Sequence, residues 1–290
     1  MMISAKTRQL LLQYQRDEIT EYHVYHRLAA RQRSAENRRV LEQIAEDERR
    51  HAVRWQSYTG EEVAPDWFKL HLYSWLGRIL GITFGVKLME RGEASAQQSY
   101  QQLAAEIPEA ARIAQEENHH EEQLLALLDE ERLRYIGSVV FGLNDALVEL
   151  TGALAGLTLA LRNTQLIALT GLITGIAAAF SMAASEYLST KTEAAERNPA
   201  RAALYTGVAY LITVALLIQP YLYLRNYYLA LACTLGLALG IIALFNYYLA
   251  VARDQPFRKR FLEMAALSLG VAGLSFLVGL ALRFFLGVEI

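Results

Sequence analysis

The chain has 290 residues, a formal net charge of −2 and a hydrophobic content of 53%. Its single cysteine, Cys233, excludes an intrachain disulfide, a CxxC metal knuckle and a rubredoxin-type iron site. Residues 1–135 hold 18 of the 28 basic and 22 of the 30 acidic residues, whereas long apolar runs dominate the remainder. This shift in composition predicts two domains, over residues 1–130 and 131–290.

Four amphipathic helices are predicted in the first domain. Apolar residues recur at helical spacing over 4–33 and 35–58, a longer helix is expected from about 67 to 103, and a fourth begins near 109. Four such helices with one long connection are typical of a ferritin-like bundle. We therefore expect an all-α protein that begins with this bundle.

An internal repeat relates the two halves of the predicted bundle. Glu18 and Glu93 are each followed seven residues later by a tyrosine. The partner helices carry matching segments, IAEDERRH over 44–51 and IAQEENHH over 113–120. Each half therefore supplies a Glu from one helix and a Glu-x-x-His from the next.

This repeat indicates a metal site. A spacing of three residues puts the Glu and the His on the same helical face. Two Glu and two Glu-x-x-His sets that face inward are typical of carboxylate-bridged di-iron sites, and carboxylates with imidazoles suit iron or manganese. One Glu-x-x-His on a charged helix more often marks a solvated face, but two in matched repeats favour metal ligands.

Residues 10–130 resemble the rubrerythrin or erythrin branch of ferritin-like proteins. The resemblance implies a di-iron centre with these ligands: Glu18, Glu48, His51, Glu93, Glu117 and His120. Glu21 and Glu90 lie one turn from the repeat glutamates, and they stay open as alternative ligands or surface residues. Complete rubrerythrins add a cysteine-rich module for electron delivery. The chain has no such module, which favours iron oxidation or iron capture over peroxidase turnover.

The stretch WFKLHLYSWLGRILGITFGVKLM, residues 67–89, has two interpretations. It is apolar, but three basic residues interrupt it and its uncharged run is too short to span a bilayer. Gly77, Gly81 and Gly85 are spaced by four and would allow close helix contact. A dimer interface or a membrane-surface contact is one interpretation, and ordinary bundle core is the other.

Five apolar segments in the second domain are each long enough for a transmembrane helix. They cover about 136–161, 165–189, 203–224, 227–251 and 262–286. Nine basic residues near the span ends lie on the bundle's side and three on the opposite side. This bias places the bundle in the cytoplasm and the C-terminus outside. A prokaryotic plasma membrane is the expected location.

Two predicted spans carry chemically notable side chains. Asp145 and Glu149 lie one turn apart in the first span, and Met182 and Glu186 have the same spacing at the inner end of the second. A carboxylate near mid-bilayer costs roughly 2.5–3.5 kcal/mol on insertion scales, so a function as a cation path is expected. Carboxylates with a thioether favour Fe²⁺ or Mn²⁺ over Mg²⁺ or Ca²⁺. Packing for Met182 and an interfacial position for Glu186 are the alternatives.

The runs GLNDALVELTGALAG and SMAASEYLS resemble the first two spans of vacuolar iron transporter proteins, which carry Fe²⁺ or Mn²⁺ in exchange for protons. The resemblance implies ion-path roles for Asp145, Met182 and Glu186. Ala178 and Thr174 stand where some members have acidic or Met residues. The whole architecture resembles the erythrin–vacuolar iron transporter fusions, for which iron export is the implied activity.

From these resemblances we expect a homodimeric membrane exporter of Fe²⁺ or Mn²⁺ with protons as counter-ions and no nucleic-acid partner. The di-iron bundle would bind, sense or oxidise cytoplasmic iron. Glu149 and Glu186 are both candidates to carry the counter-proton. Two alternatives stay open, namely a membrane-anchored ferroxidase or peroxidase, and an iron sensor or storage protein that transports nothing.

Overall fold

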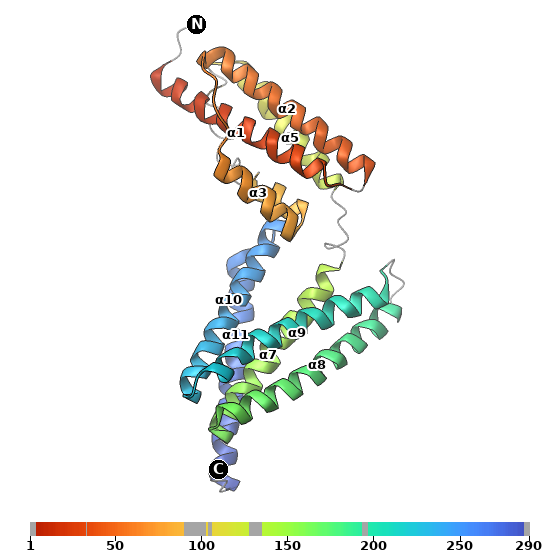
Figure 1. Ribbon diagram of the computed structural model, residues 1–290, viewed down its shortest axis with the longest axis vertical. Helices are drawn as coiled ribbons and strands as arrows, with labels where there is room; N and C mark the ends of the chain where they lie inside the picture. Colours follow the sequence, from red (N-terminus) through yellow and green to blue (C-terminus); the bar gives the residue numbers. More distant parts are fainter. Residues whose placement is uncertain are drawn as a thin grey trace. The chain divides into compact units, whose positions relative to one another are not determined.

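The computed structural model describes residues 4–32, 34–89, 103, 106–127, 135–192 and 197–286. The chain divides into two compact units, Met1–Glu130 and Glu131–Ile290. Every labelled element among the described residues is an α-helix, which confirms the predicted all-α class (Figure 1). We call the first unit the bundle and the second the membrane unit.

The bundle's helices follow the predicted order. They are α1 (Ala5–Ala29), α2 (Ala35–Thr59), α3 (Trp67–Leu80) and α5 (Glu109–Leu127). Three of them begin at a capping side chain: Ser4, Ser34 and Asp66 each accept a hydrogen bond from a backbone N–H two or three residues further on. α1 packs along α2 and against α3, and α2 packs against α5.

The predicted long helix from 67 to 103 is wrong at Gly81. α3 ends at Leu80, and Gly81 has a φ of 105°, which glycine adopts at little cost. Residues 82–89 form a second helical stretch that packs closely on α3. A Cβ on Gly85 would lie only 2.8 Å from the Cα of Gly77, so the two backbones can come this close only because both residues are glycines. Gly77 and Gly85 therefore pack against each other inside the bundle, as the ordinary-core interpretation expects.

Two apolar clusters fill the bundle and leave a polar layer between them. One contains Val24, Leu28, Leu41 and Ile44, and the other contains Leu11, Tyr14, Trp55 and Ile113 among their members. Along both α1 and α2, the predicted metal ligands lie between these clusters in sequence. The fold therefore shields this polar layer from water on both sides.

The membrane unit consists of five long helices among its described residues. They are α7 (Ile136–Leu161), α8 (Thr164–Thr192), α9 (Pro199–Tyr223), α10 (Tyr227–Arg253) and α11 (Phe257–Leu286). All five are long and apolar enough to cross a membrane. They match the five predicted spans, with boundaries a few residues apart.

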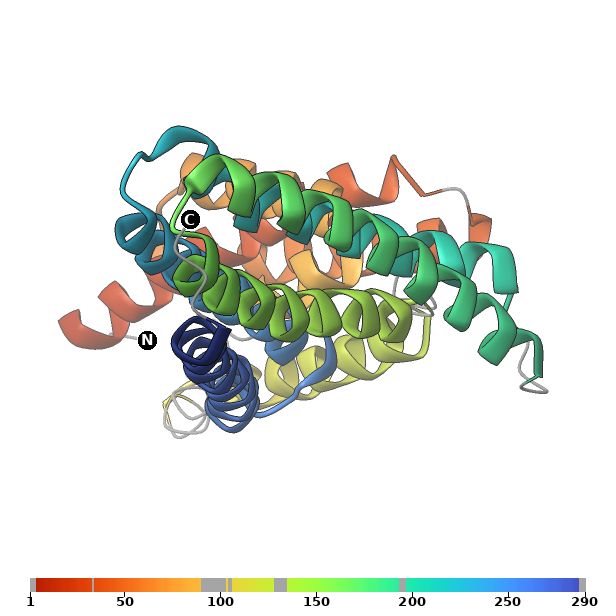
Figure 2. The same cartoon turned by 90° about the horizontal axis from the view of Figure 1, so that it is seen from below.

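α7 is the central helix of the membrane unit, since it packs against α8, α9, α10 and α11 (Figures 1 and 2). Glycines allow close contacts between α7 and α11 and between α8 and α9. A Cβ on Gly156 of α7 would lie 3.0 Å from the carbonyl oxygen of Ser275 on α11, and a Cβ on Gly175 of α8 would lie 2.8 Å from a side chain of α9. Gly236 and Gly240 have nothing within 4 Å of the Cβ position. The glycines of α7 and α8 thus serve packing within the chain.

Candidate metal centre

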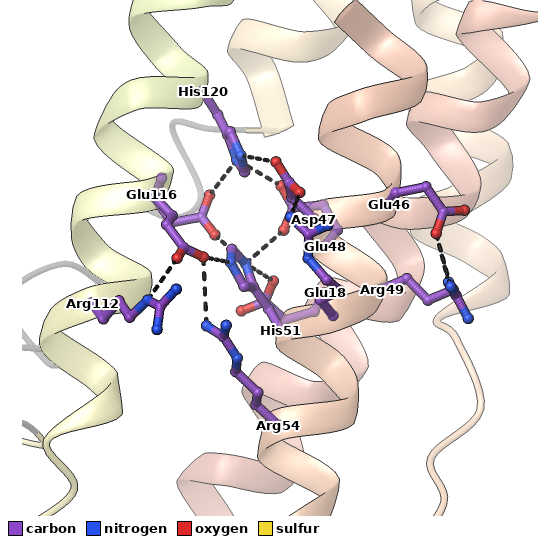
Figure 3. A network of polar contacts seen from close by, with 12 residues as sticks. Glu18, Glu46, Asp47, Glu48, Arg49, His51, Arg54, Arg112, Glu116 and His120 are labelled. Carbon is purple, nitrogen blue, oxygen red and sulfur yellow. Dashed lines mark hydrogen bonds and ion pairs between the residues drawn. The ribbon is translucent and has the colours of Figure 1, made fainter.

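Three helices of the bundle bring five predicted ligands together. α1 contributes Glu18, α2 contributes Glu48 and His51, and α5 contributes His120 (Figure 3). The fifth ligand, Glu117, also comes from α5. Four of these side chains are almost fully buried, with exposed fractions of 0–5%, and Glu117 is partly buried. We call these five residues the carboxylate–histidine cluster.

The imidazole Nδ1 atoms point at the carboxylates. Nδ1 of His51 lies 2.8 Å from Glu117 Oε1, 3.4 Å from Glu18 Oε2 and 3.4 Å from Glu48 Oε2. Nδ1 of His120 lies 3.3 Å from Glu48 Oε1 and 3.7 Å from Glu117 Oε2. One ligand atom from each of Glu18, Glu48, His51 and Glu117 lies within 4.8 Å of all the others.

The geometry of the cluster fits a bound cation. Oε2 of Glu48, Oε1 of Glu117 and the Nδ1 atoms of both histidines are buried within ion-pair distance of one another, but none makes a well-aligned hydrogen bond among the described residues. Buried polar atoms are normally hydrogen-bonded, so four convergent atoms without such a bond require an explanation. Carboxylate oxygens and imidazole nitrogens in this number would coordinate iron or manganese.

Outer carboxylates fix the two imidazole rings. Nε2 of His51 on α2 lies 2.8 Å from Glu116 Oε2 on α5, and Nε2 of His120 on α5 lies 3.0 Å from Asp47 Oδ2 on α2. The two interactions therefore cross between the helices in opposite directions. Each leaves Nδ1 directed at the cluster, which is how a carboxylate commonly orients a histidine that binds a metal.

Further side chains hold these outer groups. Glu116 contacts Arg112 at 3.0 Å and Arg54 at 3.5 Å, and Asp47 pairs with Arg50. Trp55 donates a 3.0 Å hydrogen bond from Nε1 to Glu18 Oε1. The arginines balance carboxylate charge at the edge of the site, and the indole fixes one oxygen of a ligand.

Burial and charge determine the protonation of the metal-free cluster. Burial raises the pKa of Glu18 well above its ordinary value, and the charges of Glu48 and Glu117 add to this effect. Burial opposes the charged form of His120, but its contacts with Glu117 and Glu48 raise its pKa to about 10. Contacts with His120 and His51 likewise outweigh burial and lower the pKa of Glu48 to about 2. The histidines are therefore protonated without a metal, and an arriving cation must displace these protons.

The sequence-based ligand set is only partly described. Glu93 and the alternative ligand Glu90 lie outside the described residues. Glu21 is buried, but it is not among the four residues whose ligand atoms converge. Sequence reasoning missed Asp47 and Glu116. Each directly precedes a ligand glutamate in the repeat, and this shared position is the signal that would have found them.

In the membrane unit, two of the predicted ion-path carboxylates bond to neighbouring helices. Tyr210 of α9 donates a 2.7 Å hydrogen bond to Glu149, and Ser138 of α7 donates a 2.5 Å hydrogen bond to Glu186 of α8. Asp145 is half-buried on α7, one turn before Glu149.

Met182 packs against the apolar core of the membrane unit. Within the described part of the chain, no hydrogen bond or ion pair joins Asp145 to Met182 or Glu186. The structure thus places Asp145 and Glu149 close together on α7, and it links Glu186 to that helix through Ser138.

Comparison with known proteins identifies one segment. Residues 136–197 match the VIT family. The matched segment spans α7 and α8 and includes Asp145, Glu149, Met182 and Glu186. No curated protein matches the chain. With this match and its five candidate spans, the chain is an integral membrane protein.

Proposed function

We propose that this protein transports divalent iron or manganese, and that it exports Fe²⁺ from the cytoplasm in exchange for protons. The observation that carries the proposal is that the VIT match covers the two helices holding all four predicted ion-path residues. VIT abbreviates the vacuolar iron transporters, whose first two spans these helices resemble. The match supports metal transport, and the side chains on these helices support the choice of ion.

The proposed ion path begins with the carboxylates of α7. Asp145 and Glu149 stand within a candidate span, where an acidic residue is costly and therefore expected to be functional. Met182 adds a thioether on α8, and this softer ligand favours Fe²⁺ or Mn²⁺ over Mg²⁺ or Ca²⁺. Glu149 and Glu186 already have hydroxyl partners, so either is a candidate to exchange a proton.

The surface of a single chain supports a homodimer. Glu149 is exposed although it lies inside a candidate span. A carboxylate facing lipid is unfavourable, and such residues normally face protein or a water-filled cavity. We propose that a second copy covers this face and that the two copies enclose the path.

The bundle's proposed role is to capture, sense or oxidise cytoplasmic iron. Glu18, Glu48, His51, Glu117 and His120 would hold the metal, with Glu93 as a further proposed ligand. Iron bound there would supply the redox chemistry of a ferroxidase. The protein itself supplies the water-shielded layer and the outer carboxylates that orient both histidines.

Metal flux into proteoliposomes tests the proposal. The native protein should carry Fe²⁺ and Mn²⁺, Asp145→Ala should abolish this flux, and Glu263→Ala, at an exposed position on α11, should leave it unchanged. Flux that survives in Asp145→Ala would rule out an obligatory charge at this position.

The alternative function is a membrane-anchored ferroxidase or peroxidase of rubrerythrin type. The buried carboxylate–histidine cluster is the observation that favours it. In that case no variant and no native protein would carry metal, while the native protein would still oxidise Fe²⁺ and Glu48→Ala would not.

A further inference from the structure

The outer face of α3 carries a stripe of exposed apolar side chains. It consists of Trp67, Phe68, Leu72, Trp75 and Ile79, whose exposed fractions range from 37% to 76%. Apart from Trp67 these residues are spaced by four, three and four, so they lie along one line of the helix. Val53 is the one other large exposed apolar side chain in the described part of the bundle. The stripe is therefore a specific feature of α3.

The opposite face of α3 attaches the helix to the bundle. Leu70 is fully buried in the apolar cluster that also contains Val24 and Val86, and Gly77 packs against Leu28 and Gly85. The exposed stripe is thus additional to the apolar surface that α3 needs for its own packing. Large apolar patches on a solvent-exposed surface usually mark an interaction site.

The polar residues of α3 and of the helical stretch that follows it are basic or neutral. The acidic bundle has no Asp or Glu anywhere in residues 67–89. His71 and Arg78 are exposed beside the stripe, while Lys69 pairs with Asp17 at 3.0 Å. Tryptophan and phenylalanine flanked by basic side chains are the residues that amphipathic helices place at the boundary of headgroups and acyl chains.

We propose that this stripe binds the headgroup region of a lipid bilayer. The bundle and the five candidate spans belong to one chain, so every copy of the bundle is tethered to a bilayer. Eight residues separate Leu127 of α5 from Ile136 of α7, so an extended chain between them reaches about 30 Å at most. The local concentration of lipid surface is therefore high, and a modest affinity is enough for binding. The proposal does not depend on transport.

A symmetric dimer through the same stripe fits less well. Such an interface places a patch against its own copy, so the exposed Arg78 would approach its counterpart. Residues 67–89 offer no carboxylate to balance it. A membrane surface avoids this repulsion, because anionic headgroups attract basic side chains.

Tryptophan fluorescence of the full-length protein tests the proposal. The chain has three tryptophans, and all lie in the bundle: Trp67 and Trp75 on the stripe, and Trp55, which is fully buried and bonded to Glu18. The protein is reconstituted in vesicles of phosphatidylcholine and phosphatidylglycerol, either unmodified or brominated on the acyl chain near the glycerol. Bromine quenches a tryptophan only at close range.

Brominated lipid should remove up to two-thirds of the native emission, the share of the two stripe tryptophans. A Trp67→Phe/Trp75→Phe variant keeps only Trp55 and should lose this quenching. Phe68→Ser/Leu72→Ser keeps all three tryptophans, changes only exposed positions, and should reduce the quenching. Equal native emission in both lipids would overturn the proposal. The proposal would also be overturned if the variant that retains only Trp55 were quenched as strongly as the native protein. The same holds if the stripe crosslinked to a second copy while the native emission was not quenched.

Discussion

His51 of α2 is oriented by Glu116 of α5, through a 2.8 Å contact between Nε2 and Oε2. Conversely, Asp47 of α2 orients His120 of α5, through a 3.0 Å contact between Oδ2 and Nε2. Each histidine of the cluster therefore depends on a carboxylate from the other half of the repeat. This dependence gives the first prediction.

Asp47→Ala should weaken metal binding by roughly 10- to 100-fold, as is typical when a carboxylate that orients a metal-binding histidine is lost. His120 would keep its place on α5 but lose the partner of its Nε2 atom. Titration of the purified full-length protein with Co²⁺ or Fe²⁺ measures the affinity. Glu46→Ala is the matched control, because Glu46 precedes Asp47 and its one ion pair within the described part of the chain is with the exposed Arg49. Equal affinities in the two variants would contradict the assigned role.

Glu48→Ala should remove the bound metal altogether. Glu48 is fully buried and contacts both histidines, since its oxygens lie 3.4 Å and 3.3 Å from the Nδ1 atoms of His51 and His120. Elemental analysis of the protein purified from iron-supplemented cells gives the metal content. The exposed Glu42 on the same helix provides the control Glu42→Ala. Full metal content in Glu48→Ala would show that the cluster is not the binding site.

The metal-free bundle should lose stability at high pH. The pKa of His120 is about 10, above its ordinary value of 6.5. The protonated ring therefore contributes stability that is complete below pH 6.5 and is lost as the pH rises through about 10. Glu48, with a pKa lowered from 4.5 to about 2, contributes stability that is present above pH 4.5 and is lost as the pH falls through about 2.

Thermal melts followed by tryptophan emission check this pH dependence, because all three tryptophans lie in the bundle. The melting temperature of metal-free protein should fall between about pH 6.5 and 10, and His120→Gln should flatten this fall. Metal affinity should change in the opposite sense and rise with pH over the same range, because the cation replaces protons on the histidines. An affinity that does not depend on pH would be inconsistent with protonated histidines.

Tyr210→Phe should shift the pH dependence of metal flux. The substitution removes the hydroxyl that donates to Glu149 and leaves the buried ring in place. If Glu149 carries the counter-proton, its protonation changes and the flux optimum moves. Tyr223→Phe, at an exposed position on the same helix, is the control. An unchanged pH profile of metal flux would indicate that Glu186, and not Glu149, carries the counter-proton.

Gly142→Ala should destabilise the membrane unit by about 1–3 kcal/mol, the usual cost of overpacking. A Cβ there would overlap the carbonyl oxygen of Thr206, a backbone atom that cannot rotate away. Gly240→Ala adds the same methyl group where nothing lies within 4 Å, and it should be neutral. Apparent melting temperatures in detergent compare the two variants.

The sequence predicted the parts of the site that depend on helical register. The repeat identified Glu18, Glu48, His51, Glu117 and His120 because inward-facing positions recur with the period of the helix. The five spans followed from apolar length alone. Helical period and apolar length are both properties of one continuous segment, so they can be read from a single sequence.

Other features depend on contacts between helices. The crossed interactions of Asp47 and Glu116 require two side chains on different helices to meet, and both residues look like ordinary charged surface positions in the sequence. The break at Gly81 was also missed, because the apolar period continues through it while the backbone turns. The roles of Asp145, Glu149, Met182 and Glu186 remain predictions.

The crossed carboxylate–histidine pairs make the two repeats of the bundle interdependent. A single repeat, with one lone Glu and one Glu-x-x-His, carries half of the ligands and lacks the carboxylate that orients its own histidine. Such a two-helix unit would complete the site only by pairing with another copy of itself, and the crossed bonds would then lie across the dimer interface. Joining the two copies in one chain makes that pairing independent of protein concentration, so the described ligands of the proposed metal site all come from one chain.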